Sequence, residues 1–311
     1  MCRIVARTRR KVDARVIFVF PVMIRRRSIS TPIICLSMLC GLVVLVGFNT
    51  SSKATRDSNL TMGNPSGAAK DTECSDDYLI IHDQYALSYN SSKGIPNWVS
   101  WHLSSAWKGD YKRTNPFRSD RSIPKQWYRV TKKDYNGSGF DRGHMCPSDD
   151  RDYNRTDNDA TFFMTNMVPQ AHQCNDQPWG DLEDYARELA AEGNELYIVA
   201  GPLGNGGVGA IGPAVNISKG RVEVPAYVWK VLLILENGKH DVARVGTQTR
   251  TIAVMMPNTV TAHKHKWSYY RTSVDEIECL TGYDFFSVLD DEVEASIEAR
   301  VDSMRFLSHH L

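Results

Sequence analysis

The chain has 311 residues, of which 42% are hydrophobic and 23% charged, as in an ordinary globular protein with one large domain or two small ones. Its formal net charge is +1, but residues 1–53 hold ten of the 37 lysines and arginines and one of the 36 acids. The remainder therefore carries 27 bases and 35 acids. This balance excludes attraction of an anionic partner by the overall charge, so such a partner would need a local basic patch.

Residues 1–49 predict a targeting segment. Basic residues that end in Arg25-Arg26-Arg27 precede an uncharged stretch, and its core, residues 33–48, is almost wholly apolar. This order is typical of a signal peptide or a transmembrane signal anchor, although the core is shorter than the ~20 residues of a comfortable membrane span. We expect the domain to be secreted, periplasmic or membrane-anchored outside the cytoplasm, with residues 33–48 as the attachment. An arginine-rich mitochondrial presequence is the competing interpretation.

Residues 50–73 are rich in Ser, Thr, Asn and Gly, which predicts a flexible linker before a domain at residues 74–311. None of the domain's four cysteines belongs to a Cys-x-x-Cys pair, so a zinc ribbon or a redox motif is not indicated. We hypothesise a disulfide between Cys146 and Cys174, because both lie beside polar motifs described below. Buried apolar thiols are the alternative. The four cysteines are Cys74, Cys146, Cys174 and Cys279.

The domain opens with short runs that predict strands at residues 78–81, 85–89 and 98–103. Residues 108–133 then carry nine lysines and arginines against two acids, with aromatic residues between them. Bases beside aromatic rings suit a nucleic-acid backbone with stacked bases. A solvated loop whose aromatic rings belong to the core is the alternative.

Asp141-Arg142-Gly143-His144 follows a turn at residues 136–139 and is expected to form the end of a strand. An imidazole takes up a proton near neutral pH, and a guanidinium forks onto phosphate oxygens. Gly143 would let the backbone turn so that both side chains face one ligand. The motif therefore suggests phosphate chemistry with a histidine base, with Asp141 as structural support.

Residues 161–168 predict a strand stopped by Pro169, with Asn166 as a polar side chain at the end of an apolar face. Such an asparagine either bonds the backbone or faces a site. Residues 178–192 predict a helix, because a proline stands in its first turn and a glycine follows its end.

The helix would present an amide, Asn175, and a carboxylate, Glu183, within two turns of each other near its positive end. Glu183 and Arg187 are four residues apart and can pair. Further strands are expected at residues 196–200, 221–235, 241–246 and 251–256, and acidic helices at residues 274–286 and 289–304.

In this order the expected elements form a β-β-α unit. The sequence resembles the non-specific DNA/RNA endonucleases of the ββα-metal class, which include endonuclease G and secreted bacterial nucleases. The resemblance covers about residues 75–300 and implies an α+β fold with a central antiparallel sheet flanked by helices. It rests on residues 138–144, Asp150-Arg151, Thr161-Phe162, residues 165–170, Asn175 with Trp179, Leu182-Glu183 with Arg187, and residues 274–278 and 281–286.

The resemblance implies hydrolysis of DNA and RNA without strong sequence specificity, leaving 5′-phosphate ends. It implies a divalent cation, Mg²⁺ first, with Mn²⁺ or another divalent cation as the alternative. The implied roles are general base for His144, metal ligand for Asn175, holder of a metal-bound water for Glu183, support of the site for Asn166, and phosphate contact for Arg142 and Arg187.

Two other functions stay open: a catalytically inactive nuclease-like module that binds nucleic acid, and a phosphodiesterase acting on small phosphoesters. The chain could also form a homodimer. His263 and His265 stand two residues apart, as in some transition-metal sites, but no third ligand stands nearby. We interpret them as surface residues.

Overall fold

The computed structural model describes residues 53–304. The expected targeting segment at residues 1–49, including the apolar core at 33–48, lies outside them. Within the described part, no helix combines the length and apolar character needed to cross a membrane.

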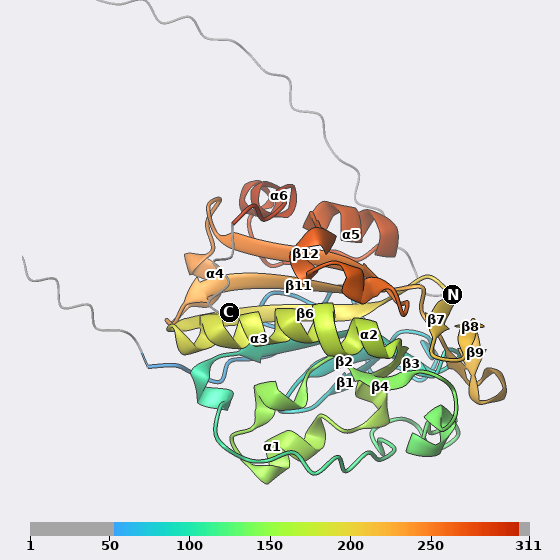
Figure 1. Cartoon of the computed structure of the whole chain (residues 1–311). Helices are drawn as coiled ribbons and strands as arrows, with labels where there is room; N and C mark the ends of the chain where they lie inside the picture. The colour runs from blue at the N-terminus through green and yellow to red at the C-terminus, as the bar shows by residue number, and fades with distance from the viewer. Residues whose placement is uncertain (1–52, 305–311) are drawn as a thin grey trace, which may run out of the picture. The chain divides into compact units, whose positions relative to one another are not determined.

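A seven-stranded antiparallel sheet organises the domain (Figure 1), with the strand order β1-β2-β3-β6-β11-β12-β13. Its two central strands, β6 and β11, are the longest and are buried along most of their length because both faces of the sheet are covered. The strands are β1 (Tyr78–Ile81), β2 (Ala86–Asn90), β3 (Ile95–Leu103), β6 (Asn194–Leu203), β11 (Tyr227–Glu236), β12 (Arg250–Pro257) and β13 (Arg271–Thr272).

The sheet separates two hydrophobic cores. Side chains alternate across a strand, so Trp101 of β3 enters the first core while Trp98 of the same strand enters the second. The first core is covered by a hairpin of β4 (Asp141–His144) and β5 (Met167–Gln170) and by α3 (Gly180–Ala191), which lies in front of the sheet in Figure 1. The second contains residues of α5 (Val274–Thr281) and α6 (Asp291–Glu298).

The remaining regular elements are short and lie in the connections. They are α1 (Arg155–Ala160), α2 (His172–Cys174), α4 (Asp241–Arg244), β7 (Gly207–Gly209), β8 (Gly212–Ala214), β9 (Asn216–Ile217) and β10 (Val222–Glu223).

Two expected strands are wrong. Residues 161–168 instead hold a 3₁₀ turn at Met164–Asn166, and β5 begins at Met167 and includes Pro169. The proline is tolerated because β4 is the single neighbour of β5, and an edge strand can carry a residue without an N–H. Residues 241–246 contain the helix α4, in which Asp241 and Arg244 pair at 2.8 Å.

The segment expected to be a flexible linker differs from that expectation. Arg56 forms an ion pair with Asp157 at 2.9 Å and lies 4.2 Å from the centre of the Trp107 ring. Asn59 donates to the Asp83 carbonyl at 3.1 Å. Polar side chains in this segment thus find partners on the domain, which a composition rich in serine and asparagine does not reveal.

The hypothesised disulfide between Cys146 and Cys174 is wrong. Both residues are free thiols in the first core. Burial raises the pKa of Cys146 to about 12 and that of Cys174 to about 11. Both thiols are therefore neutral apolar side chains and poor nucleophiles.

Candidate active site

The strand β4 carries the Asp141-Arg142-Gly143-His144 motif against β5. Gly143 lies inside this strand and does not act as a turn. A Cβ atom at Gly143 would lie 2.6 Å from Cβ of Gln170, so glycine is required for the close approach of the two strands. The sequence indicated that Gly143 matters, but for a turn, whereas the structure requires it for this close approach.

His144 ends β4 among aromatic rings. Its ring centroid lies 4.9 Å from that of Phe162 and 5.7 Å from that of Phe117. Its Nε2 atom is buried and has no hydrogen-bond partner within residues 53–304. Burial, assisted by the charge of Arg113, lowers the pKa of His144 from 6.5 to about 3. The imidazole is therefore neutral at physiological pH.

Asn175 lies beside the same motif. Its amide nitrogen donates to Asp141 Oδ2 at 3.1 Å, and His172 Nδ1 lies 2.8 Å from that oxygen. Asp141 therefore holds the amide of Asn175 by its nitrogen, which leaves the amide oxygen for a ligand. The contact raises the pKa of His172, because the Asp141 carboxylate stabilises the imidazolium.

The helix that carries Asn175 is not uniform. It runs from α2 through a π-helical turn, Asn175–Trp179, into α3. A π-helix advances about 80° per residue and an α-helix about 100°. The wider turn removes most of the angular offset between Asn175 and Glu183, so both side chains turn toward one side of the helix.

Glu183 lies in the first turn of α3 and has a partner that the sequence did not indicate. Lys230 Nζ, on β11, donates to Glu183 Oε1 at 3.0 Å, and the lysine side chain is 1% exposed. The ammonium lies 4.0 Å from the centre of the Trp179 ring. Burial raises the pKa of Glu183 and lowers that of Lys230, and their mutual attraction opposes both shifts. Lys230 thus holds one oxygen of the carboxylate and leaves the other.

Arg187 does not pair with Glu183, four residues earlier, but with Asp150 and Asp184. The Asp150 contact measures 3.0 Å, and Asp150 is itself buried and accepts from Trp101. Burial acts to lower the pKa of Arg187, but the neighbouring carboxylates outweigh it and raise that pKa. The guanidinium therefore remains a fixed positive charge beside the Glu183 carboxylate.

The side chains of Asn166 and Arg142 form hydrogen bonds with other protein groups. The Asn166 side chain accepts from the Cys146 N–H at 2.9 Å and donates to the carbonyls of Cys146 and Thr161. It fixes the backbone just after His144. Arg142 donates to the Lys132 carbonyl at 2.9 Å and to Asn136 Oδ1 at 2.8 Å. Its guanidinium lies 5.2 Å from the Phe117 ring, which also contacts His144.

Three residues at this site were not identified as site residues from the sequence. Arg113 was one of nine bases in an irregular stretch, Lys230 lay inside an apolar strand, and His172 stood in a short connection. An isolated lysine in an otherwise apolar strand is the one signal that could have been used, because an unpaired buried lysine is costly. Its partner comes from a distant element.

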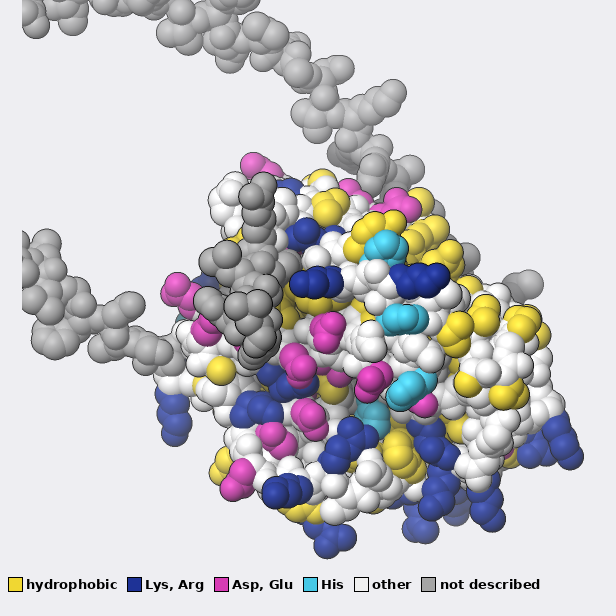
Figure 2. Space-filling model, viewed as in Figure 1, with side chains coloured by type: hydrophobic (Ala, Val, Ile, Leu, Met, Phe, Trp, Pro, Cys, Tyr) yellow, Lys and Arg dark blue, Asp and Glu magenta, His cyan; other side chains and the backbone are white. Residues whose placement is uncertain are grey.

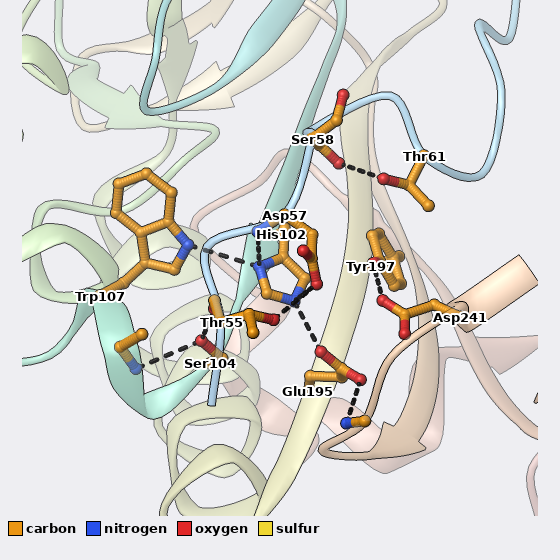
Figure 3. Close-up of polar contacts among 12 residues, drawn as sticks. Thr55, Asp57, Ser58, Thr61, His102, Ser104, Trp107, Glu195, Tyr197 and Asp241 are labelled. Atoms are coloured by element: carbon orange, nitrogen blue, oxygen red, sulfur yellow. Dashed lines mark hydrogen bonds and ion pairs between the residues drawn. The ribbon is translucent and has the colours of Figure 1, made fainter. Parts of the chain in front are cut away.

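A second group with metal-ligand side chains consists of Asp57, His102 and Glu195 (Figure 3). His102 Nδ1 accepts from the Asp57 N–H at 3.3 Å and from Trp107 Nε1 at 3.4 Å, and Nε2 lies 3.2 Å from Glu195. Two donors at Nδ1 place the proton on Nε2, which then donates to the carboxylate. Neither nitrogen has a lone pair free for a cation, so this group is structural.

The surface around the domain is unevenly charged despite the near-neutral total. Figure 2 shows lysines and arginines gathered on the lower half of the viewed face, with acidic residues at its centre and left and histidines along its middle. Positive side chains are thus more frequent in one part of this face, although the formal net charge of the chain is only +1.

Comparisons with known proteins extend the resemblance. The sequence model of the family described as DNA/RNA non-specific endonuclease matches residues 64–292. The chain is 47% identical over 245 residues to "Nuclease" from Nostoc sp., covering 79% of this chain and 86% of that protein. It is 31% identical over 234 residues to "Nuclease EXOG, mitochondrial" from Xenopus laevis, covering 73% of this chain and 63% of that protein.

The crystal structure of the EndoG/EndoGI complex contains a similar chain, with a TM-score of 0.61 and 27% identity. The alignment covers 75% of this chain and 91% of that chain. This confirms the expected α+β fold with a central antiparallel sheet and helices. Since the family match spans most of the described residues, the chain belongs to the DNA/RNA non-specific endonuclease family and is a metal-dependent hydrolase acting on ester bonds of nucleic acids.

Proposed function

We propose that this domain cleaves phosphodiester bonds within DNA and RNA without strong sequence specificity, with His144 as the general base, and leaves 5′-phosphate ends. The observation that carries the proposal is the state of His144: neutral, packed against the rings of Phe117 and Phe162, and with no hydrogen-bond partner on Nε2 among the described residues. A base needs an unprotonated nitrogen near neutral pH. A satisfied structural histidine would show both nitrogens engaged, as His102 does.

The residues present fit a hard divalent cation such as Mg²⁺. Asn175 contributes an amide oxygen, because Asp141 occupies only its nitrogen. Glu183 has one carboxylate oxygen held by Lys230 and a second for a metal-bound water. Mg²⁺ prefers oxygen ligands and keeps several waters, so one protein oxygen is sufficient anchoring. When bound, the cation offsets negative charge on the phosphate and the leaving oxygen.

The chain's own side chains would then divide the work. His144 takes the proton of the attacking water, and the Asn166 side chain keeps the backbone after His144 in place. Arg113 and Arg142 both lie beside the rings that surround His144. Their guanidinium groups would bind phosphate oxygens.

Further residues position the metal ligand and the Glu183 carboxylate without touching the substrate. His172 and Asp141 orient the Asn175 amide. Arg187, fixed by Asp150 at 3.0 Å, would place a positive charge beside Glu183, the residue that would hold a metal-bound water.

Plasmid nicking with and without metal tests the proposal. With Mg²⁺ the full-length protein should nick and then linearise supercoiled DNA and degrade RNA. EDTA should abolish both activities, and Asn175→Ala should require much more Mg²⁺ for the same rate. Asn205→Ala is the matched control, because Asn205 is an exposed asparagine on a glycine-rich loop. It should behave as the wild type.

The outcomes separate the alternatives. Binding of DNA without cleavage at any Mg²⁺ concentration would indicate an inactive nuclease-like module. Turnover of a small phosphodiester at a rate independent of salt, with no nicking, would indicate a small-molecule phosphodiesterase. End-labelling of the products before and after phosphatase treatment tests the 5′-phosphate assignment.

We propose that residues 1–49 direct the domain out of the cytosol, by export or by import into an organelle. The basic residues followed by an apolar core support a targeting segment. The mitochondrial location in the names of EXOG and endonuclease G relatives favours the presequence alternative. Mass spectrometry of the mature N-terminus distinguishes cleavage from anchoring.

A further inference from the structure

A basic cavity opens near the candidate active site without belonging to it. It has a volume of about 700 Å³, and we call it the arginine pocket. Its lining residues are Arg118, Ser119, Asp120, Arg121, Ser122, Arg129 and Phe163. Three guanidinium groups thus line one cavity, and each can fork onto phosphate oxygens.

Among the residues that the structure describes, no carboxylate forms an ion pair with the three arginines of this pocket. Arg129 donates one bond, from Nη2 to the Ile123 carbonyl at 3.2 Å, and its Nε is buried without a hydrogen-bond partner. The Arg118 guanidinium lies 4.1 Å from the centre of the Phe163 ring and donates to the Pro116 carbonyl at 3.3 Å. Arg121 is exposed. An unpaired buried guanidinium nitrogen is costly unless a ligand satisfies it.

The single acid of the pocket is already occupied. One oxygen of Asp120 lies 3.0 Å from His82 Nε2 and accepts from the Thr165 hydroxyl at 2.7 Å, and the other accepts from the Ser122 N–H at 2.8 Å. Asp120 is 2% exposed. It therefore shapes the floor of the pocket and does not compete for the arginines.

The pocket and the base share a wall. The Arg118 N–H donates to the Phe162 carbonyl at 3.2 Å, and the Phe162 ring lies 4.9 Å from the His144 ring. Phe163, the next residue, lines the pocket. Phe162 and Phe163 thus link the wall of the pocket to the surroundings of His144.

We propose that the arginine pocket binds a backbone phosphate of the nucleic acid, flanking the phosphate that is cleaved; this rests on the proposed function. Contacts to phosphate carry no base information, so the pocket adds affinity without sequence preference. It makes the enzyme favour polymers over single phosphodiesters, because only a polymer reaches both positions.

The test uses Arg121→Ala and the double variant Arg121→Ala/Arg129→Ala in the full chain. On a long single-stranded DNA, KM should rise several-fold for the single variant and about ten-fold for the double one, with kcat unchanged. The rate on bis(p-nitrophenyl) phosphate, which cannot span both positions, should not change in either variant. Arg300→Ala is the matched control, because Arg300 follows α6 on the opposite face of the sheet.

Binding measured on a His144→Ala background separates this proposal from the proposed function. The slope of log Kd against log salt for single-stranded DNA should fall by roughly 0.7 for each lost phosphate contact. An unchanged KM and an unchanged slope in both variants overturn the arginine pocket as a phosphate subsite. A fall in the rate on bis(p-nitrophenyl) phosphate overturns its separation from the catalytic centre. If the wild type binds DNA but does not cleave it, the proposed function fails while the slope still tests the pocket.

Discussion

His102 and His144 lie in the same domain, and the fold treats the two imidazoles in opposite ways. His102 is 0% exposed, and hydrogen bonds from Asp57 and Trp107 and to Glu195 engage both of its nitrogens. His144 is packed against two phenylalanine rings, and its Nε2 has no partner. Burial alone therefore does not distinguish a structural histidine from the histidine proposed as the base. The difference between the two is whether surrounding protein groups engage both ring nitrogens.

Glu298 extends this comparison to a carboxylic acid. Its Oε1 is also buried and has no hydrogen-bond partner in the described part of the chain. Glu298 lies beside Glu278 and Asp275, on the other face of the sheet. Burial favours the neutral form in both cases, so it lowers the pKa of His144 and raises that of Glu298. A buried atom without a partner is therefore not by itself evidence of a catalytic role.

Replacing His144 should have the largest effect on activity. We expect His144→Ala to lower kcat on plasmid DNA by about 10²–10⁴-fold, the range for loss of a general base, while thermal unfolding stays close to that of the wild type. His265→Ala is the matched control, because His265 is exposed and stacks on Tyr269. Equal losses in the two variants would contradict the assignment of the base.

Replacing His102 should do the reverse. We expect His102→Ala to lower the free energy of unfolding by about 2–3 kcal/mol, because the buried Glu195 loses a partner, while the folded fraction keeps its kcat. Urea denaturation measures the first quantity and nicking below the transition measures the second. A stable variant with a large loss of kcat would place His102 in the chemistry and remove the contrast.

The pH dependence of stability should report Glu298. Burial, and then the neighbouring Glu278 and Glu294, raise the pKa of Glu298 from 4.5 to about 9. The folded state therefore holds a proton that the unfolded state releases, and this contribution to stability is lost as pH rises from 4.5 toward 9. Glu298→Gln cannot ionise and should unfold at a higher temperature than the wild type at pH 8, and at a similar temperature at pH 4. No gain at pH 8 would show that Glu298 is stabilised in its charged form.

The smallest effect is expected in the pH profile of activity. An ordinary histidine base loses activity as pH falls through 6.5, but burial lowers the pKa of His144 to about 3. Since kcat/KM follows ionisations of the free enzyme, it should show no acid limb near pH 6.5 between pH 7 and pH 5 at saturating Mg²⁺. A limb centred near 6.5 would mean that the free imidazole is solvated. A parallel titration of His144 by NMR identifies the group.

Much of the fold was readable from local patterns. The strands at residues 78–81 and 251–256 and the helix that carries Glu183 were placed correctly because their apolar spacing reflects which face is buried. The strand at residues 161–168 was wrong because Phe162 and Met164 are buried by packing in a turn and not by strand pairing. An apolar run of that length does not reveal whether its backbone hydrogen bonds go to another strand.

By itself, the sequence determined the family, the order of the elements and the motif residues, including His144, Asn175 and Glu183, since these depend on residue type and spacing along the chain. Tertiary structure alone decided their chemical states. Lys230 donates to Glu183 from another element, and Asp141 accepts from the nitrogen of the Asn175 amide. The Asn166 side chain accepts from a backbone N–H. A side chain's pKa and free lone pairs depend on neighbours that folding brings together, and the linear sequence does not specify those distances.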